Sequence, residues 1–195
     1  MLPDHVLSDQ PLPSQFRYPR NIPRQPLIDY EYGGIALNDS SRGLRAKVWR
    51  GDYIEDQVVL SAEGVAPTAV LSMPNLRDFS FTFDQNMRVA IAYVRYDGVA
   101  AFYWFDATIP GYTTLNLQGA ITPRCAMDDN RDTQTSRADI ILAYMRSGSL
   151  YFREQRDRYQ IERFLSDEGG EGGLIQIGMN RNWRFQFQFS NSSLT

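Results

Sequence analysis

The chain has 195 residues, of which 43% are hydrophobic and 13% aromatic, so it is long and apolar enough to fold around a core of its own. The formal net charge of −3 and the 22% of charged residues argue against wholesale disorder and against direct binding to nucleic acid, which needs a basic face. No stretch approaches the roughly 20 apolar residues of a membrane helix, and the first residues lack the basic and apolar regions of a signal peptide.

Residues 1–29 differ in composition from the rest of the chain, because they hold six of its ten prolines. Proline fixes φ and removes a backbone donor, so we expect an extended, proline-rich arm there. A disordered leader is one interpretation, but the apolar side chains between the prolines favour an arm that lies along a neighbouring subunit. The expected anchors of this arm are Leu12, Phe16, Tyr18, Ile22 and Leu27.

The segment at 30–34 is expected to join the arm to the folded domain. Gly33 and Gly34 can adopt backbone angles that other residues avoid, so we expect them to act as a hinge. Residues 30–195 would then form one all-β domain.

Short runs of aromatic and branched residues separated by turn residues predict strands along this domain. The predicted strands are Leu44–Trp49, Gln57–Ser61, Ala69–Leu71, Asp78–Phe83, Val89–Arg95, Ala100–Asp106, Thr113–Leu117, Arg124–Met127, Ile140–Arg146, Leu150–Gln155, Tyr159–Phe164, Leu174–Met179 and Trp183–Phe189. Gly51 is expected to turn the chain between Trp49 and Tyr53.

The segment Glu154–Leu165 allows two structures, a short helix or two strands joined at Arg156-Asp157. The overlapping charged run 153–163 alternates in sign. It also allows two roles, a salt-bridged surface or a contact between subunits. Arginine and tyrosine are enriched at interfaces. The residues of this possible interface are Arg153, Arg156, Arg158 and Tyr159.

A weak internal repeat connects the predicted strands. Ala-Tyr-x-Arg occurs at 92–95 and again at 143–146, each time before a turn and another aromatic strand. The turns that precede these two strings are also similar, FDQN at 83–86 and MDDN at 127–130. A third similar turn, MNRN, occurs at 179–182. Spacings of this size match a four-stranded propeller blade, and about three blades would fit. The sheets therefore stack as a sandwich, or subunits complete each other's blades, or the echo is chance.

The chain contains few residues of the types that commonly serve in catalysis or metal binding. Cys125 is the only cysteine and His5 the only histidine, which excludes an internal disulfide, a cysteine zinc cluster and a histidine-based triad within one chain. We therefore expect no cofactor and no enzyme activity. Cys125 is predicted to be a buried, inert thiol.

Two acidic patterns have features of functional sites. The loop 128–139 places acids at several calcium-loop positions but lacks the turn glycine, which favours a solvated turn. A pair of carboxylates could hydrolyse glycosides if it flanked a groove. The candidates are Asp84, Asp106, Asp128 and Asp157, although an Asp that follows a strand more often forms a turn.

Several longer strings are similar to those of a known class of proteins. They read YEYGGIALNDSSRGL at 30–44, FTFDQNM at 81–87, YWFD at 103–106, ILAY at 141–144, LYFREQRDRY at 150–159, QIGMN at 176–180 and FQF at 185–187. As a set they resemble virion structural proteins of tailed bacteriophages, from the tail or its tip. The resemblance spans about residues 28–190 and brings no catalytic residue with it.

The resemblance implies a structural component of the virion tail, made in the bacterial host cytoplasm. We expect an all-β fold with antiparallel sheets, propeller-like or sandwich, preceded by the proline-rich arm. The expected partners are copies of the same chain and neighbouring proteins of the tail tip or of the head–tail junction, with no membrane contact. The alternative is a receptor- or glycan-binding module of the tail tip that uses Trp49, Tyr103 or Trp104.

Overall fold

The computed structural model describes residues 34–35, 48–84, 86–128, 139–167, 173–179 and 185–189. These residues form antiparallel strands joined by turns, with one 3-10 turn and no α-helix among them. The prediction of an all-β fold is confirmed. The arm at 1–29 lies outside the described residues.

Four sheets follow one another in chain order, and each is a meander of neighbouring strands. The first sheet contains β1 (Gly34–Ile35), β2 (Val48–Ile54), β3 (Gln57–Ala62) and β4 (Val65–Ser72). The second contains β5 (Leu76–Phe83), β6 (Val89–Arg95), β7 (Ala100–Asp106) and β8 (Gly111–Asn116). The third contains β9 (Ile121–Asp128), β10 (Asp139–Arg146), β11 (Ser149–Glu154) and β12 (Arg163–Ser166). The fourth is the hairpin of β13 (Leu174–Met179) and β14 (Phe185–Phe189).

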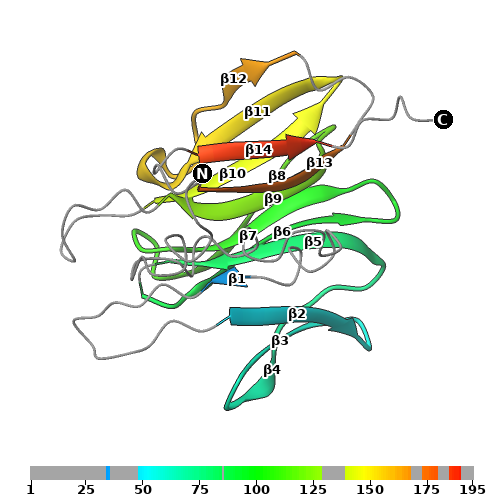
Figure 1. Cartoon of the computed structure of the whole chain (residues 1–195), viewed down its shortest axis with the longest axis vertical. Coiled ribbons are helices and arrows are strands. Elements are labelled where there is room, and N and C mark those ends of the chain that lie inside the picture. Colours follow the sequence, from blue (N-terminus) through cyan, green and yellow to red (C-terminus); the bar gives the residue numbers. More distant parts are fainter. Residues whose placement is uncertain are drawn as a thin grey trace, which may run out of the picture.

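The sheets stack face to face, and the first strand of each one contacts the first strand of the next. Thus β1 contacts β5, β5 contacts β9, and β9 contacts β13. Figure 1 shows β2–β4 at one end of the molecule, β10–β12 toward the other, and β5–β7 between them. In the described part of the chain these antiparallel sheets form an open, sandwich-like stack and not a closed ring.

The first and second sheets are held together by an aromatic core. On β5, alternate residues point to opposite faces, so Phe79, Phe81 and Phe83 share one face and pack with Val58 and Leu60 of β3. The three rings form a chain, with centroids 6.4 Å apart for the first pair and 6.0 Å for the second. This is the alternation that the sequence predicted.

The opposite face of β5 is also buried, because the third sheet covers it. Ser80 is 8% exposed, and its hydroxyl accepts a hydrogen bond from the backbone N–H of Cys125 on β9 (3.1 Å). Nearby, Arg124 of β9 donates to Asp78 of β5 (2.8 Å). Thr122 likewise links the third sheet to the hairpin, since its hydroxyl accepts from the backbone N–H of Leu174 (2.9 Å). Polar bonds therefore set the register between sheets that apolar side chains hold together.

A second core lies between the second and third sheets. It brings Phe102 and Trp104 of β7 against Leu142 and Tyr144 of β10, with Tyr159 between the layers. The Tyr159 ring is fully buried and meets Phe102 and Trp104 edge-on, with centroids 4.8 Å away in both cases. A smaller cluster then joins β10 and β11 to β13.

The internal repeat is confirmed as a structural repeat. Ala92-Tyr93-Val94-Arg95 closes β6 and Ala143-Tyr144-Met145-Arg146 closes β10, and both are second strands of their sheets. The turn echoes also correspond, because β5, β9 and β13 end at Phe83, Asp128 and Met179.

Two local predictions are wrong. Gly51 does not turn the chain but lies inside β2, paired with Leu60 of β3. It is needed there for space, since an added Cβ would lie 2.8 Å from the Phe81 ring and 2.9 Å from that of Phe79. The strand predicted from Tyr159 is also shorter, because β12 begins only at Arg163.

The connection between β11 and β12 contains a 3-10 turn at Gln155–Asp157. Arg158 and Tyr159 follow it with left-handed backbone angles. The segment 154–165 is therefore not an α-helix, because it leads from the end of β11 through the 3-10 turn into β12.

Candidate binding groove

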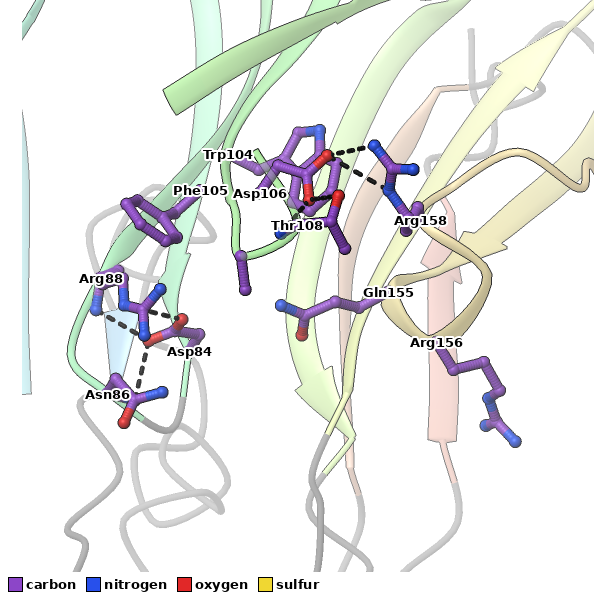
Figure 2. A pocket seen from close by; sticks show the side chains of 11 residues that line it. Asp84, Asn86, Arg88, Trp104, Phe105, Asp106, Thr108, Gln155, Arg156 and Arg158 are labelled. Atoms are coloured by element: carbon purple, nitrogen blue, oxygen red, sulfur yellow. Dashed lines mark hydrogen bonds and ion pairs between the residues drawn. The ribbon is translucent and has the colours of Figure 1, made fainter. Parts of the chain in front are cut away.

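A groove of about 340 Å³ opens where the turns of the second sheet meet the 3-10 turn of the third. It combines acidic, basic, amide and aromatic side chains. Its walls are Asp84, Asn86, Arg88, Trp104, Phe105, Asp106, Ala107, Thr108, Gln155, Arg156 and Arg158. Figure 2 shows Asp84 and Arg88 on one side, Asp106 and Arg158 on the other, and Gln155 between them.

Asp84 immediately follows β5 and shapes the β5–β6 turn. Its Oδ1 accepts hydrogen bonds from the backbone N–H groups of Asn86 (2.8 Å) and Arg88 (2.9 Å). Its Oδ2 lies 3.6 Å from Nε of Arg88. Asp84 is 7% exposed as a residue, although Asn86 in the same turn is exposed. Forming a turn is the common role of Asp after a strand.

Asp106 plays the same part at the end of β7. Its Oδ1 accepts from the backbone N–H (2.9 Å) and the hydroxyl (2.7 Å) of Thr108. Its Oδ2 accepts from Nε (3.2 Å) and Nη2 (2.5 Å) of Arg158. Burial alone would raise the pKa of the Asp106 carboxyl, but the bonds from Thr108 and Arg158 outweigh it and hold the pKa below its usual range.

Two arginines reach the groove from opposite sides. The Arg88 guanidinium lies over the Phe105 ring, with its Cζ 4.0 Å from the ring centroid. Arg158 arrives from the third sheet with φ 57° and ψ 32°. Such angles are unfavourable for a residue with a side chain. Burial of the neighbouring Tyr159 ring compensates for them and fixes the direction of the Arg158 side chain.

Gln155 and Arg156 complete the groove on the side of the third sheet. The Gln155 side-chain oxygen accepts from the backbone N–H of Ile140 (3.0 Å), which fixes the amide. Arg156 forms ion pairs with Glu154 (2.6 Å) and Asp139 (3.3 Å). Figure 2 shows the Arg156 guanidinium directed away from the two aspartates.

The chemistry of the groove is therefore that of a hydrogen-bond donor surface. The carboxylate oxygens of Asp84 and Asp106 are occupied by turn and ion-pair bonds, so they serve structure rather than proton transfer. Nη1 of Arg158, both terminal nitrogens of Arg88 and the amide nitrogen of Gln155 make no hydrogen bond to the residues described, whereas Nη2 of Arg158 donates to Asp106. Among the described residues no cluster of acids, cysteines or histidines could hold a metal ion.

The four residues expected at an interface have different environments. Arg153 bonds within the third sheet, to the Tyr144 hydroxyl (2.8 Å) and to Glu162 (3.1 Å). Arg158 and Arg156 line the groove with side chains that are 45% and 55% exposed. Tyr159 does not face outward, because its ring completes the core between the second and third sheets.

The candidate acids and the hinge glycines also lie in different places. Of the possible glycosidase acids, Asp84 and Asp106 share the groove, whereas Asp157 accepts from Arg163 (2.7 Å). Asp128 pairs with Asp139 at the end of the β9–β10 ladder, and the rest of the acidic loop lies outside the described residues. Gly34 of the expected hinge lies in β1 opposite Trp49. Gly33 and the arm anchors Leu12, Phe16, Tyr18, Ile22 and Leu27 lie outside the described residues.

The aromatic residues proposed for glycan binding offer little free surface. Trp104 is 6% exposed, and Trp49 and Tyr103 pack partly against the core between the first two sheets. The Tyr103 ring also stacks on Tyr112, with centroids 4.7 Å apart. These rings belong mainly to the scaffold.

Cys125 is buried, as predicted. Burial raises the pKa of its thiol to about 12, so the thiolate is scarce at neutral pH. Within the described part of the chain, no helix has the length and apolar character that a membrane crossing requires.

Sequence reasoning did not single out Arg88, Thr108 or Gln155. The available signal was an Asp two residues before a Thr or an Asn, as at 84–86 and 106–108, which is typical of side-chain-capped turns. That signal places each turn, but it does not show that these two turns of the second sheet face the 3-10 turn of the third.

Comparisons with protein-family models, with curated proteins and with solved structures find no match to this chain.

Proposed function

We propose that this protein is a structural subunit of a bacteriophage tail, which assembles with copies of itself and with neighbouring tail proteins. The similarity of its sequence strings to tail and tail-tip proteins supports this proposal, and so does an all-β scaffold of stacked sheets. The groove supports it as well, because its acids are committed to turns and leave a donor surface suited to binding.

The outer strand of the third sheet is the observation that carries the proposal. β12 is the last strand of that sheet, and it exposes Phe164 (58%) and Leu165 (43%). Ile161 just before it is 52% exposed. A strand edge with exposed apolar side chains is a template for pairing with another chain. Such an edge fits a subunit whose surface is covered on assembly.

Quantitative mass spectrometry of purified virions tests the function. The phage that encodes this chain is grown, and its particles are purified through a density gradient. We expect the chain in the particles in several copies, in constant ratio to known tail proteins. Its presence only in the lysate, and not in particles, would contradict the proposal.

A further inference from the structure

We propose that the groove between the second and third sheets binds the carboxylate of an Asp or Glu side chain on a partner protein. This inference rests on the proposed function, because it gives the chemistry by which the subunit recognises a neighbour. Its site is nevertheless defined by the groove alone.

The groove offers donors in the pattern that a carboxylate accepts. Arg158 uses Nε and Nη2 for Asp106, which leaves Nη1 without a partner among the described residues. Arg88 keeps both terminal nitrogens free of hydrogen bonds to described residues. The amide nitrogen of Gln155 lies between them. A planar guanidinium presents paired N–H groups that match the two oxygens of a carboxylate.

The same groove is poorly suited to a neutral sugar. Sugar hydroxyls need acceptors as well as donors. Oδ1 of Asp84 and both oxygens of Asp106 already accept bonds from within the fold, and Oδ2 of Asp84 is ion-paired with Arg88. A sugar ring also needs a free aromatic face. The Phe105 ring is covered by Arg88, and Trp104 is 6% exposed. A ligand that only accepts hydrogen bonds therefore fits best.

The argument rests on free donors and not on net charge. Arg88 and Arg158 lie beside Asp84 and Asp106, whereas Arg156 pairs with Glu154 and Asp139 and points away from them. An acidic side chain of a neighbour would meet the guanidinium nitrogens that these pairs leave free. A volume of about 340 Å³ is enough for one acidic side chain and part of the backbone that carries it.

The donors are held in place before any ligand arrives. Arg158 is fixed by its left-handed backbone and its bonds to Asp106, and Arg88 by stacking on Phe105. The Gln155 amide is fixed by its bond from Ile140. Little side-chain entropy is therefore lost on binding.

The test is a titration of the full chain with a short peptide. Binding is monitored by the NMR signals of the arginine Nε–H groups and of the glutamine side-chain amides. The probe is acetyl-Ala-Glu-Ala-amide, and its Gln counterpart is the neutral control. We expect the Glu peptide to shift the signals of Arg88, Arg158 and Gln155, and the Gln peptide to leave them unchanged. Equal shifts from both peptides, or no shift up to millimolar peptide, would overturn the proposal.

Variants assign the binding to the groove. Arg88→Gln keeps the β5–β6 turn, which is formed by backbone N–H groups, and should weaken binding of the Glu peptide about fivefold or more. Arg158→Lys keeps a charge beside Asp106 but loses the fork, and should also weaken it. Arg77→Gln, an exposed arginine on β5, is the matched control and should leave binding unchanged. An equal loss in the Arg77 variant would contradict the assignment.

Further ligands identify the source of the acid. Inorganic phosphate and glucuronate are titrated under the same conditions. Weaker binding of both than of the Glu peptide supports a protein partner, whereas tighter binding of either one overturns that assignment. Because the titration uses the isolated chain, peptide binding can succeed even if the chain is absent from virions, and it can fail while the chain is present in them.

Discussion

Asp106 shows at the scale of one residue how a charged group serves the fold. All of its described bonds come from one turn and one arginine of the next sheet, so it joins two repeats. Asp84 lacks the bond across sheets but forms the corresponding turn. The sequence suggested that both acids form turns, and the structure confirms it. The sequence could not place Arg158 beside Asp106, because that contact spans 52 positions and depends on sheet stacking.

Asp106→Asn should reduce the free energy of unfolding at pH 7 by about 1–3 kcal/mol, because it removes the charge that receives the Arg158 bonds. The folded pKa of this carboxyl lies below the unfolded one, so its stabilisation is present above the unfolded pKa and is lost as the pH falls through the folded value. Urea unfolding at several pH values measures both effects. The variant and the natural chain should converge in acid, and a difference independent of pH would contradict the ion-pair explanation.

Cys125 allows a second test at this scale. Its buried thiol contacts the backbone carbonyls of Ser80 on β5 and Ala90 on β6. Burial raises the pKa of the thiol to about 12. A thiol reagent at pH 8 should therefore react only when the fold opens. The labelling rate should increase with urea in step with unfolding followed by fluorescence. Rapid labelling of the folded chain would show that the thiol is accessible.

At the scale of elements, the sequence predicts strands well where both faces of a sheet are buried or alternate clearly. The strands Val89–Arg95, Ala100–Asp106 and Leu174–Met179 have the predicted bounds. The failures have physical causes. Gly51 is a turn residue by local preference, but ring packing against it decides its place in β2. Tyr159 has strand preference, but its burial between two sheets imposes a left-handed turn instead.

Gly51→Ala should destabilise the fold by about 1–3 kcal/mol, because the new methyl group would overlap the Phe79 and Phe81 rings. Gly178→Ala is the matched control, since a Cβ there meets nothing within 4 Å and β13 is also a strand. Thermal unfolding of the three proteins makes the comparison. Equal stability of the Gly51 variant and the natural chain would mean that the rings do not pack as described.

The edge strand β12 gives a prediction about association. Phe164→Lys should leave the melting temperature nearly unchanged, because the side chain is 58% exposed, but should reduce self-association or binding to tail partners. Ile109→Lys, at the similarly exposed β7–β8 turn, is the control and should associate normally. Analytical ultracentrifugation measures both. Unchanged association of the Phe164 variant would remove β12 from the interface.

At the scale of the whole molecule, the sequence predicted the class of fold and the repeat but not the order of the stack. The three four-stranded sheets and the hairpin arise because each repeat begins with a strand that contacts the first strand of the next. No local signal specifies that contact, since it depends on the burial of both faces of β5 and β9. Open rows of such sheets leave outer strands and turns for partners.

The proline-rich arm gives a further prediction at this scale. The full chain and a chain that starts at Leu27 are compared by light scattering over a range of concentrations. We expect the full chain to form larger, defined oligomers, because the arm would add apolar contacts to a neighbour. If both proteins stay monomeric at high concentration, and neither binds tail proteins, the arm has no such role.

The central claim is that this scaffold is a repeated part of a tail, and cryo-microscopy of the intact particle tests it most directly. A reconstruction of the tail should contain several symmetry-related copies of the stacked sheets, with neighbours against β12 and an acidic side chain in the groove. A complete tail map whose density is wholly assigned to other chains would contradict the claim.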